Sequence, residues 1–117
     1  MPPTFDEQAE WFDAHYGSTR GRVRLALVLE RIEELFPAPP ARVLDVGGGS
    51  GAVAIPLAER GYEVTLLDPS EGMVRVAHDR IRTSGVDVRV IHGGIDDIPS
   101  LGLDPDAICC HAVLFLP

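Results

Sequence analysis

Residues 43–51 place an acidic side chain and a group of glycines at the end of a short apolar run. The run Val43–Val46 contains Asp45, and four glycines occupy the five positions 47–51. Glycine lets a backbone approach a ligand closely, because no side chain stands in the way. Most glycine-rich turns of this kind hold phosphates, but a nearby carboxylate opposes an anion. The charge of Asp45 therefore bears directly on which ligand the turn binds.

Two motif patterns fit these glycines, and they predict different ligands. The pattern G-x-G-x-x-A, from Gly47 to Ala52, is typical of dinucleotide cofactors, and Asp68 lies about twenty residues further on, where the ribose-binding acid of such sites is found. The pattern D-x-G-x-G-x-G, from Asp45 to Gly51, is that of the nucleotide-binding loop of class I S-adenosylmethionine-dependent methyltransferases, which the whole segment resembles. A nicotinamide or flavin cofactor and S-adenosylmethionine are therefore the two alternatives.

The charge of Asp45 favours the second alternative. A pyrophosphate at a helix N-terminus needs backbone donors and positive potential, which a carboxylate at the end of the same strand opposes. S-adenosylmethionine has no phosphate, and its sulfonium and ammonium cations are both stabilised by a nearby carboxylate. Asp68 can accept hydrogen bonds from both ribose hydroxyls of either ligand. We therefore expect S-adenosylmethionine to bind at Asp45, Asp68 and the backbone of Gly47, Gly48 and Gly49.

A second loop with acidic residues covers positions 92–98, after the third predicted strand. In class I methyltransferases an acidic residue of this loop meets the exocyclic amine of adenine, while apolar neighbours sandwich the ring. The resemblance implies Asp96 for the amine, with Asp97 as the alternative, and Ile95 for the ring. The other interpretation of Asp96 is a cap for the turn before Pro99.

Alternating strands and helices must position these residues. Strands are predicted at 43–46, 64–67, 86–91 and over most of 107–116, and helices at 5–12, 20–36, 52–60 and between Ser70 and Gly85. This alternation predicts right-handed crossovers and a parallel sheet with helices on both faces. The glycines, Asp68 and the 93–97 loop all fall at carboxyl ends of strands, which is where such sheets bind ligands.

Several residues mark the ends and faces of the predicted helices. Ser70 is a suitable N-cap and Gly85 a suitable terminator. Pro56 conflicts with a helix over 52–60, because proline removes an intrahelical hydrogen bond. The helix over 20–36 is expected to bury a stripe of apolar residues at helical spacing: Leu25, Leu29, Ile32 and Phe36.

Composition indicates one soluble domain. The chain has 117 residues, 45% of them hydrophobic, and a net charge of -8, which does not favour broad binding to nucleic acid. It contains neither an apolar stretch of membrane-spanning length nor a secretory signal at the N-terminus, so a cytoplasmic location is expected. The adjacent Cys109 and Cys110 would point to opposite faces of a strand and are expected to be free thiols. The four histidines lack metal-ligand spacing, so no metal is expected.

Nearly all of the chain resembles the first half of the bacterial tRNA 5-carboxymethoxyuridine methyltransferases. The resemblance lies in Phe12-Asp13, Tyr16 to Arg24, Arg42 to Gly49, Ala58 to Gly61 and His111 to Leu114. It implies a single S-adenosylmethionine-binding domain over residues 1–117, with a helical cap at 1–38 and a Rossmann-like core at 41–117. The doubly wound α/β sheet of this fold would be truncated to about four strands, preceded by two helices.

The resemblance also assigns roles to residues near both ends of the chain. Arg24 matches an arginine that binds the methionine carboxylate of the cofactor, a contact that suits a guanidinium group. A solvated helix end is the other interpretation of the arginines at 20, 22 and 24. His111 matches a histidine at the cofactor site, although a histidine satisfied at a strand end is the alternative. Tyr16 would lie near the cofactor cation or serve in packing.

The implied reaction is methyl transfer from the sulfonium to the carboxymethoxy group of a tRNA wobble uridine. The acceptor is already a carboxylate at neutral pH, so catalysis would be mainly positioning, and no catalytic residue is assigned. A small-molecule acceptor, a non-catalytic S-adenosylmethionine-binding or structural module, and an NAD-dependent oxidoreductase are the alternatives. We expect the chain to be a fragment of a longer enzyme or, alternatively, a half-domain that forms a homodimer over the exposed edge of its fourth strand.

Overall fold

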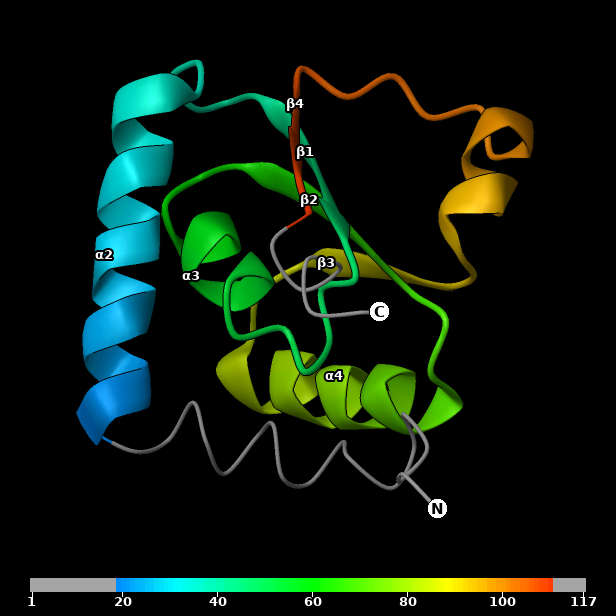
Figure 1. The fold of residues 1–117 in the computed structure, drawn as a ribbon, viewed down its shortest axis with the longest axis horizontal. Helices are drawn as coiled ribbons and strands as arrows, with labels where there is room; N and C mark the ends of the chain where they lie inside the picture. Colours follow the sequence, from blue (N-terminus) through cyan, green and yellow to red (C-terminus); the bar gives the residue numbers. More distant parts are fainter. Residues whose placement is uncertain (1–18, 111–117) are drawn as a thin grey trace.

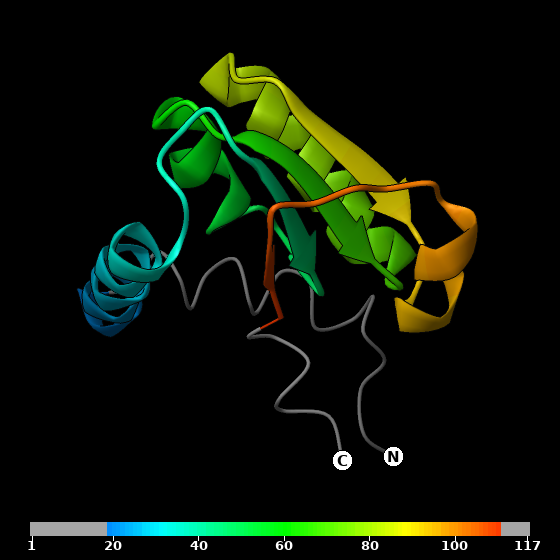
Figure 2. The same cartoon turned by 90° about the horizontal axis from the view of Figure 1, so that it is seen from above.

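Four parallel strands form one sheet in the computed structural model, which describes residues 19–110 (Figures 1 and 2). The elements follow one another along the chain as α2 (Thr19–Leu35), β1 (Arg42–Val46), α3 (Ala54–Glu59), β2 (Glu63–Asp68), α4 (Glu71–Ser84), β3 (Val88–His92), the 3-10 helix η1 (Ile95–Ser100) and β4 (Ala107–Cys109). The helix predicted at 5–12, together with Tyr16 and His111, lies outside the described residues. The predicted alternation of strands and helices is confirmed in the described part.

The strands lie side by side in the order β3-β2-β1-β4, and each neighbouring pair is parallel. The chain therefore builds outward from β1 to β3 and then crosses to the other side of β1 to form β4. Such a reversal of direction opens a crevice at the carboxyl ends of the central strands, which is where doubly wound sheets bind their ligands. The predicted Rossmann-like α/β fold is confirmed.

The two faces of the sheet are covered unequally. Side chains of α2, α3 and α4 join one face in the larger core, whose members include Leu29, Ile32, Val43, Leu57, Leu66 and Ala77. On the other face, Leu44, Val46 and Leu67 pack against a few side chains of β3, η1 and the loop after η1. Ile108 of β4 lies beside Leu44 in the sheet and is 55% exposed.

The predicted helix signals act as expected in α4. The Ser70 hydroxyl accepts the N–H of Met73 at 3.2 Å, which is the hydrogen bond of an N-cap. Gly85 ends the helix with a left-handed φ of 73°, and its N–H donates to the carbonyl of Ile81 at 3.1 Å. The predicted apolar stripe of α2 also packs on the core, with Leu29 and Ile32 buried and Leu25 and Phe36 partly buried.

The expected conflict at Pro56 is wrong, because α3 is shorter than predicted. The helix begins at Ala54, so Pro56 lies in its first turn, where N–H groups have no partner within the helix. Its carbonyl still accepts the N–H of Arg60 at 3.2 Å. Proline therefore removes no hydrogen bond from within this helix.

Three further expectations concern the third strand, the two cysteines and the absence of a membrane-spanning helix. β3 lies at one edge of the four-stranded sheet that the described residues form, and it begins at Val88 rather than at residue 86. Cys109 is buried and Cys110 exposed, and both are free thiols. None of the helices in residues 19–110 combines the length and the apolar character that crossing a membrane requires.

Candidate functional site

The glycine loop, residues 47–51, leaves the carboxyl end of β1 and is held against β2. The N–H groups of Gly47 and Gly48 both donate to the carbonyl of Leu67, at 2.7 and 3.3 Å. Positive φ angles of 69°, 59° and 86° occur at Gly47, Gly49 and Gly51. Other residues rarely adopt this conformation, so the pattern D-x-G-x-G-x-G matches the backbone of the turn.

Gly48 is required for a different reason, which is packing inside the protein. A Cβ at this position would lie 2.6 Å from Cγ of Leu66 and 2.7 Å from Oδ2 of Asp45. Both distances are too short for real contacts, so a side chain here would displace the core of the sheet or the buried acid. Core packing alone therefore demands glycine at position 48.

Asp68, at the carboxyl end of β2, ties the loop to the start of α4. Its Oδ2 accepts the N–H of Gly49 at 2.9 Å, and its Oδ1 accepts the N–H of Ser70 at 2.9 Å. The side chain is buried, and the two backbone donors stabilise its negative charge. Sequence reasoning missed this structural role, although Asp-Pro-Ser at 68–70 is a pattern in which an aspartate accepts the N–H two residues on.

Asp45 lies near the end of β1 and is completely buried, with 0% of its surface exposed. Neither carboxyl oxygen has a hydrogen-bond partner among the described residues. Burial and, secondly, the negative charge of Asp68 raise the pKa of Asp45 from 3.8 to about 7. A cation brought close to this group would lower the pKa again, because it favours the ionised form. The acid predicted from the motif is thus present, but beneath the loop rather than open to solvent.

The two aspartates of the loop after β3, Asp96 and Asp97, have different roles. The N–H of Gly94 donates to Oδ2 of Asp97 at 2.8 Å, and the N–H of Asp97 donates to the carbonyl of Gly94 at 3.0 Å. Asp97 therefore caps η1, which is the capping role that the sequence offered for Asp96. The Asp96 side chain is exposed and makes no hydrogen bond or ion pair within residues 19–110, and Ile95 beside it is 54% exposed. Both are accessible to a ligand.

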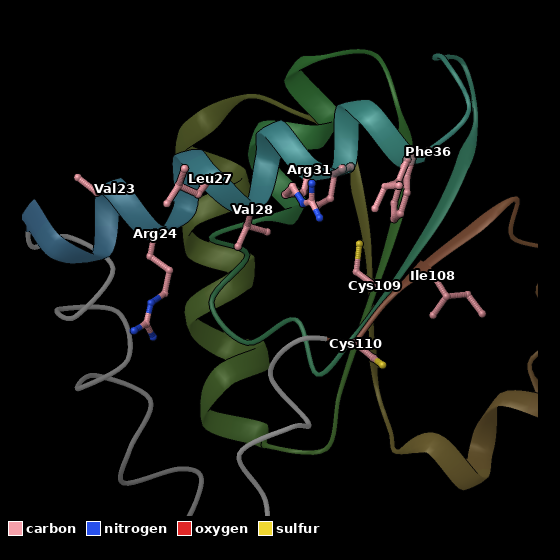
Figure 3. A pocket seen from close by; sticks show the side chains of 11 residues that line it. Val23, Arg24, Leu27, Val28, Arg31, Phe36, Ile108, Cys109 and Cys110 are labelled. Carbon is pink, nitrogen blue, oxygen red and sulfur yellow. The ribbon is translucent and has the colours of Figure 1, made fainter.

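Arg24 lies on α2 and lines a groove of about 710 Å³ between this helix and β4 (Figure 3). The groove reaches Cys109, which is the partner of Asp45 in the register of β1 and β4. No hydrogen bond or ion pair joins Arg24 to the glycine loop within the described residues, so its role toward a methionine carboxylate stays a prediction. His111 comes directly after Cys110, the last described residue, and its predicted role lies outside the described residues.

The described residues thus gather backbone donors and two buried acids at the carboxyl ends of β1 and β2. Within this part of the chain, no three side chains of histidine, cysteine, aspartate or glutamate are grouped so that they could hold a metal ion. A site of this kind can bind a nucleoside through Asp68 and the loop after β3, and it can place a positive charge near Asp45.

Comparisons with known proteins identify similar sequences and similar folds. The tRNA 5-carboxymethoxyuridine methyltransferase of Escherichia coli (strain K12) is 39% identical over 117 residues, and the match covers 94% of this chain and 45% of the relative. The chain therefore spans less than half the length of this relative.

Two solved structures share the fold. An S-adenosyl-L-methionine-dependent methyltransferase of Methanococcus maripaludis superposes with a TM-score of 0.82 at 22% identity, covering 100% of this chain and 55% of that one. The magnesium protoporphyrin IX methyltransferase of Synechocystis PCC 6803, solved with bound SAH, superposes with a TM-score of 0.63 at 27% identity, covering 74% of this chain and 40% of that one. The profile of the methyltransferase domain family matches residues 43–117. The chain belongs to the methyltransferase domain family.

Proposed function

We propose that this chain binds S-adenosylmethionine and forms the cofactor-binding part of a methyltransferase. The observation that carries the proposal is the buried carboxyl group of Asp45, which has no partner among the described residues and lies directly beneath the glycine loop. A ligand with a positive charge stabilises such a group, whereas the pyrophosphate of a dinucleotide would meet two buried acids. The match to the methyltransferase domain family and the SAH bound in the Synechocystis relative support the same ligand.

The described residues suggest how the cofactor would be held. Each carboxylate oxygen of Asp68 accepts a backbone N–H, and a carboxylate oxygen can accept more than one hydrogen bond, so ribose hydroxyls can still be received. Asp96 would accept from the adenine amine, while Ile95 would pack on the ring. Arg24 would pair with the methionine carboxylate from the groove between α2 and β4.

When bound, the cofactor supplies an electrophilic methyl group, and the chain supplies its orientation. Asp68 and the glycine loop would fix the nucleoside, so that the sulfonium methyl points out of the crevice toward an acceptor. The acceptor oxygen would attack the methyl carbon as the carbon–sulfur bond breaks, and the electron pair of that bond would pass to sulfur. No general base is needed where the acceptor is already a carboxylate.

The acceptor that we propose is the carboxymethoxy group of a wobble uridine in tRNA. The 39% identity to a tRNA 5-carboxymethoxyuridine methyltransferase extends over 94% of this chain, and this is the support for the assignment. A small-molecule acceptor is the second candidate, which the likeness to magnesium protoporphyrin IX methyltransferase favours. We further propose that residues 1–117 form a single domain, with a helical cap at 1–38 and a core at 41–117. The proposed location of the protein is the cytoplasm.

Two experiments test the proposal. Calorimetric titration of the chain with S-adenosylhomocysteine and with NADH should detect binding of the first ligand only, and binding of NADH alone would overturn the cofactor assignment. Transfer of a radiolabelled methyl group from S-adenosylmethionine to tRNA bearing carboxymethoxyuridine tests the acceptor. Incorporation should occur with this tRNA and not with tRNA whose wobble uridine is unmodified, and equal labelling of both would remove the proposed acceptor.

A further inference from the structure

The surroundings of Asp45 contain acids and thiols but no compensating cation among its described neighbours. From β2, the charge of Asp68 acts on Asp45. From β4, Cys109 lies opposite Asp45 in the register, and burial, Asp45 and Cys110 together raise the pKa of the Cys109 thiol to about 12. Cys109 is therefore a neutral thiol near neutral pH. The two described titratable groups identified beside Asp45 are therefore a negative charge, on Asp68, and an uncharged thiol, on Cys109.

The two acids differ in how their charge is stabilised. Asp68 accepts an N–H with each carboxyl oxygen, at 2.9 Å in both cases, so its ionised form is supported by two donors. Asp45 accepts none among the described residues and has no exposed surface. An ionised Asp45 beside an ionised Asp68 is costly, and a proton on Asp45 removes that cost.

Only a thin layer of main chain separates Asp45 from the outside of the loop. Its Oδ2 would be 2.7 Å from a Cβ at Gly48, and Gly48 itself is partly exposed. A ligand seated on the loop therefore acts on this carboxyl group across one peptide layer. In such a poorly solvated place, a unit charge on the ligand has a strong effect on protonation.

We propose that Asp45 distinguishes the sulfonium of the methyl donor from the thioether of its product through a proton, which it holds in the ligand-free protein and releases when the sulfonium binds. This inference rests on the proposed function, since it assumes that the site takes S-adenosylmethionine. The donor and S-adenosylhomocysteine differ by one methyl group and one positive charge on sulfur. Both ligands carry the ammonium group, so its effect is shared. Methyl transfer turns the sulfonium into a neutral thioether, so Asp45 regains a proton from solvent and its attraction to the sulfur is lost.

The inference predicts a pH-dependent preference for the donor. Below a pH of about 7, binding of the donor must displace the proton of Asp45. The ratio of donor affinity to product affinity should therefore rise by up to about tenfold for each unit by which the pH increases. Above that pH, Asp45 is already ionised and the ratio should level off. Binding of S-adenosylhomocysteine should change little over the same range.

Calorimetry in paired buffers tests the inference on the unaltered chain. Titrations at pH 6 and pH 8, each in two buffers with different ionisation enthalpies, measure the protons exchanged on binding. S-adenosylmethionine should release up to about one proton at pH 6 and close to none at pH 8, while S-adenosylhomocysteine should release close to none at either pH. This measurement needs no variant, so it does not depend on whether a mutant folds.

Two matched variants locate the proton. Asp45→Asn keeps the shape of the side chain but cannot ionise, so proton release should vanish and the donor-to-product ratio should become independent of pH. Asp87→Asn removes an exposed carboxylate between α4 and β3, and it should behave like the unaltered chain.

The possible failures are distinguishable. If neither ligand binds at any pH, the proposed function falls, and this inference falls with it. If both ligands bind but the donor releases no proton at pH 6, only the inference is overturned. Proton release that persists in Asp45→Asn would also overturn it, because another group would then carry the proton.

Discussion

Asp45 and Asp68 lie at the carboxyl ends of neighbouring strands and are both buried, but the surrounding backbone stabilises their charges differently. Asp68 is surrounded by backbone donors from the turns that follow β1 and β2, whereas Asp45 accepts no hydrogen bond from the described residues. The difference arises from position. Asp68 is the last residue of its strand, so the turn folds over it, but Val46 follows Asp45 within β1. An unsatisfied acid inside a protein reduces stability, and such sites are commonly functional.

The raised pKa of Asp45 makes stability depend on pH. In the unfolded chain this group titrates at an ordinary pKa of 3.8, whereas in the folded chain it titrates at about 7. Between these values the folded state holds the proton more tightly, so this group's contribution to stability falls as pH rises through that window and is constant above it. Asp45→Asn should therefore stabilise the protein, by about 2 kcal/mol more at pH 8 than at pH 5.5.

Urea unfolding at the two pH values measures this difference. Asp79→Asn is the control, because Asp79 is exposed on α4 and its ion pair with Arg82 is open to solvent. The control should change stability little at either pH. A gain for Asp45→Asn that is the same at both pH values would mean that Asp45 is ionised throughout.

Asp68 combines a structural role with the predicted contact to ribose. Asp68→Ala removes the acceptors of the Gly49 and Ser70 N–H groups, so it should destabilise the chain by roughly 1–3 kcal/mol. The substitution should also lower the affinity for S-adenosylhomocysteine by about tenfold or more, because charge-assisted hydrogen bonds to a buried partner are lost. Thermal unfolding measures the first effect and calorimetric titration the second. Lost stability with unchanged affinity would reduce Asp68 to a purely structural residue.

At the scale of elements, the ends and faces of the helices could be predicted where the signal lies within the helix sequence itself. The cap of α4 by Ser70 and its end at Gly85 depend on neighbours a few residues away, and both are confirmed. The buried stripe of α2 follows from the spacing of its apolar residues, and it is confirmed as well. The start of α3 was missed, and the capping role that was offered as the alternative for Asp96 belongs to Asp97. Each depends on one residue of register within a loop, which spacing alone does not determine.

Gly48 shows a requirement that the motif pattern does not reveal. Gly48→Ala should destabilise the chain by about 1–3 kcal/mol, because its Cβ would overlap the Leu66 side chain and the buried acid. Gly94→Ala is the matched control, since a Cβ there meets nothing within 4 Å and the φ of -114° suits any residue. Chemical denaturation of the two variants measures the effect. Equal stability of the two would show that the loop after β1 can shift to make room.

At the scale of the whole molecule, alternation of strands and helices predicted a parallel sheet and the edge at which the site lies. The expectation of helices on both faces holds only in part, because the α-helices of the described residues share one face and only the 3-10 helix η1 lies on the other. Alternation alone does not predict this, since the face of a right-handed crossover depends on the order of the strands in the sheet. In the described residues, α2, α3 and α4 share one face, and the groove between α2 and β4 is left open (Figures 2 and 3). Leu27 and Ile108 contribute exposed apolar surface there, at 58% and 55%.

An apolar groove beside a strand edge that has no partner among residues 19–110 favours association of this chain with itself. We expect light scattering coupled to gel filtration to show a dimer whose fraction rises with concentration. Leu27→Glu combined with Ile108→Lys should return the chain to a monomer with unchanged circular dichroism, because charges would then line both walls of the groove. Ala26→Glu, exposed on the same helix but outside the groove, should leave the dimer intact. A monomer at every concentration would contradict this prediction, because the β4 edge and the groove would then stay hydrated without driving association.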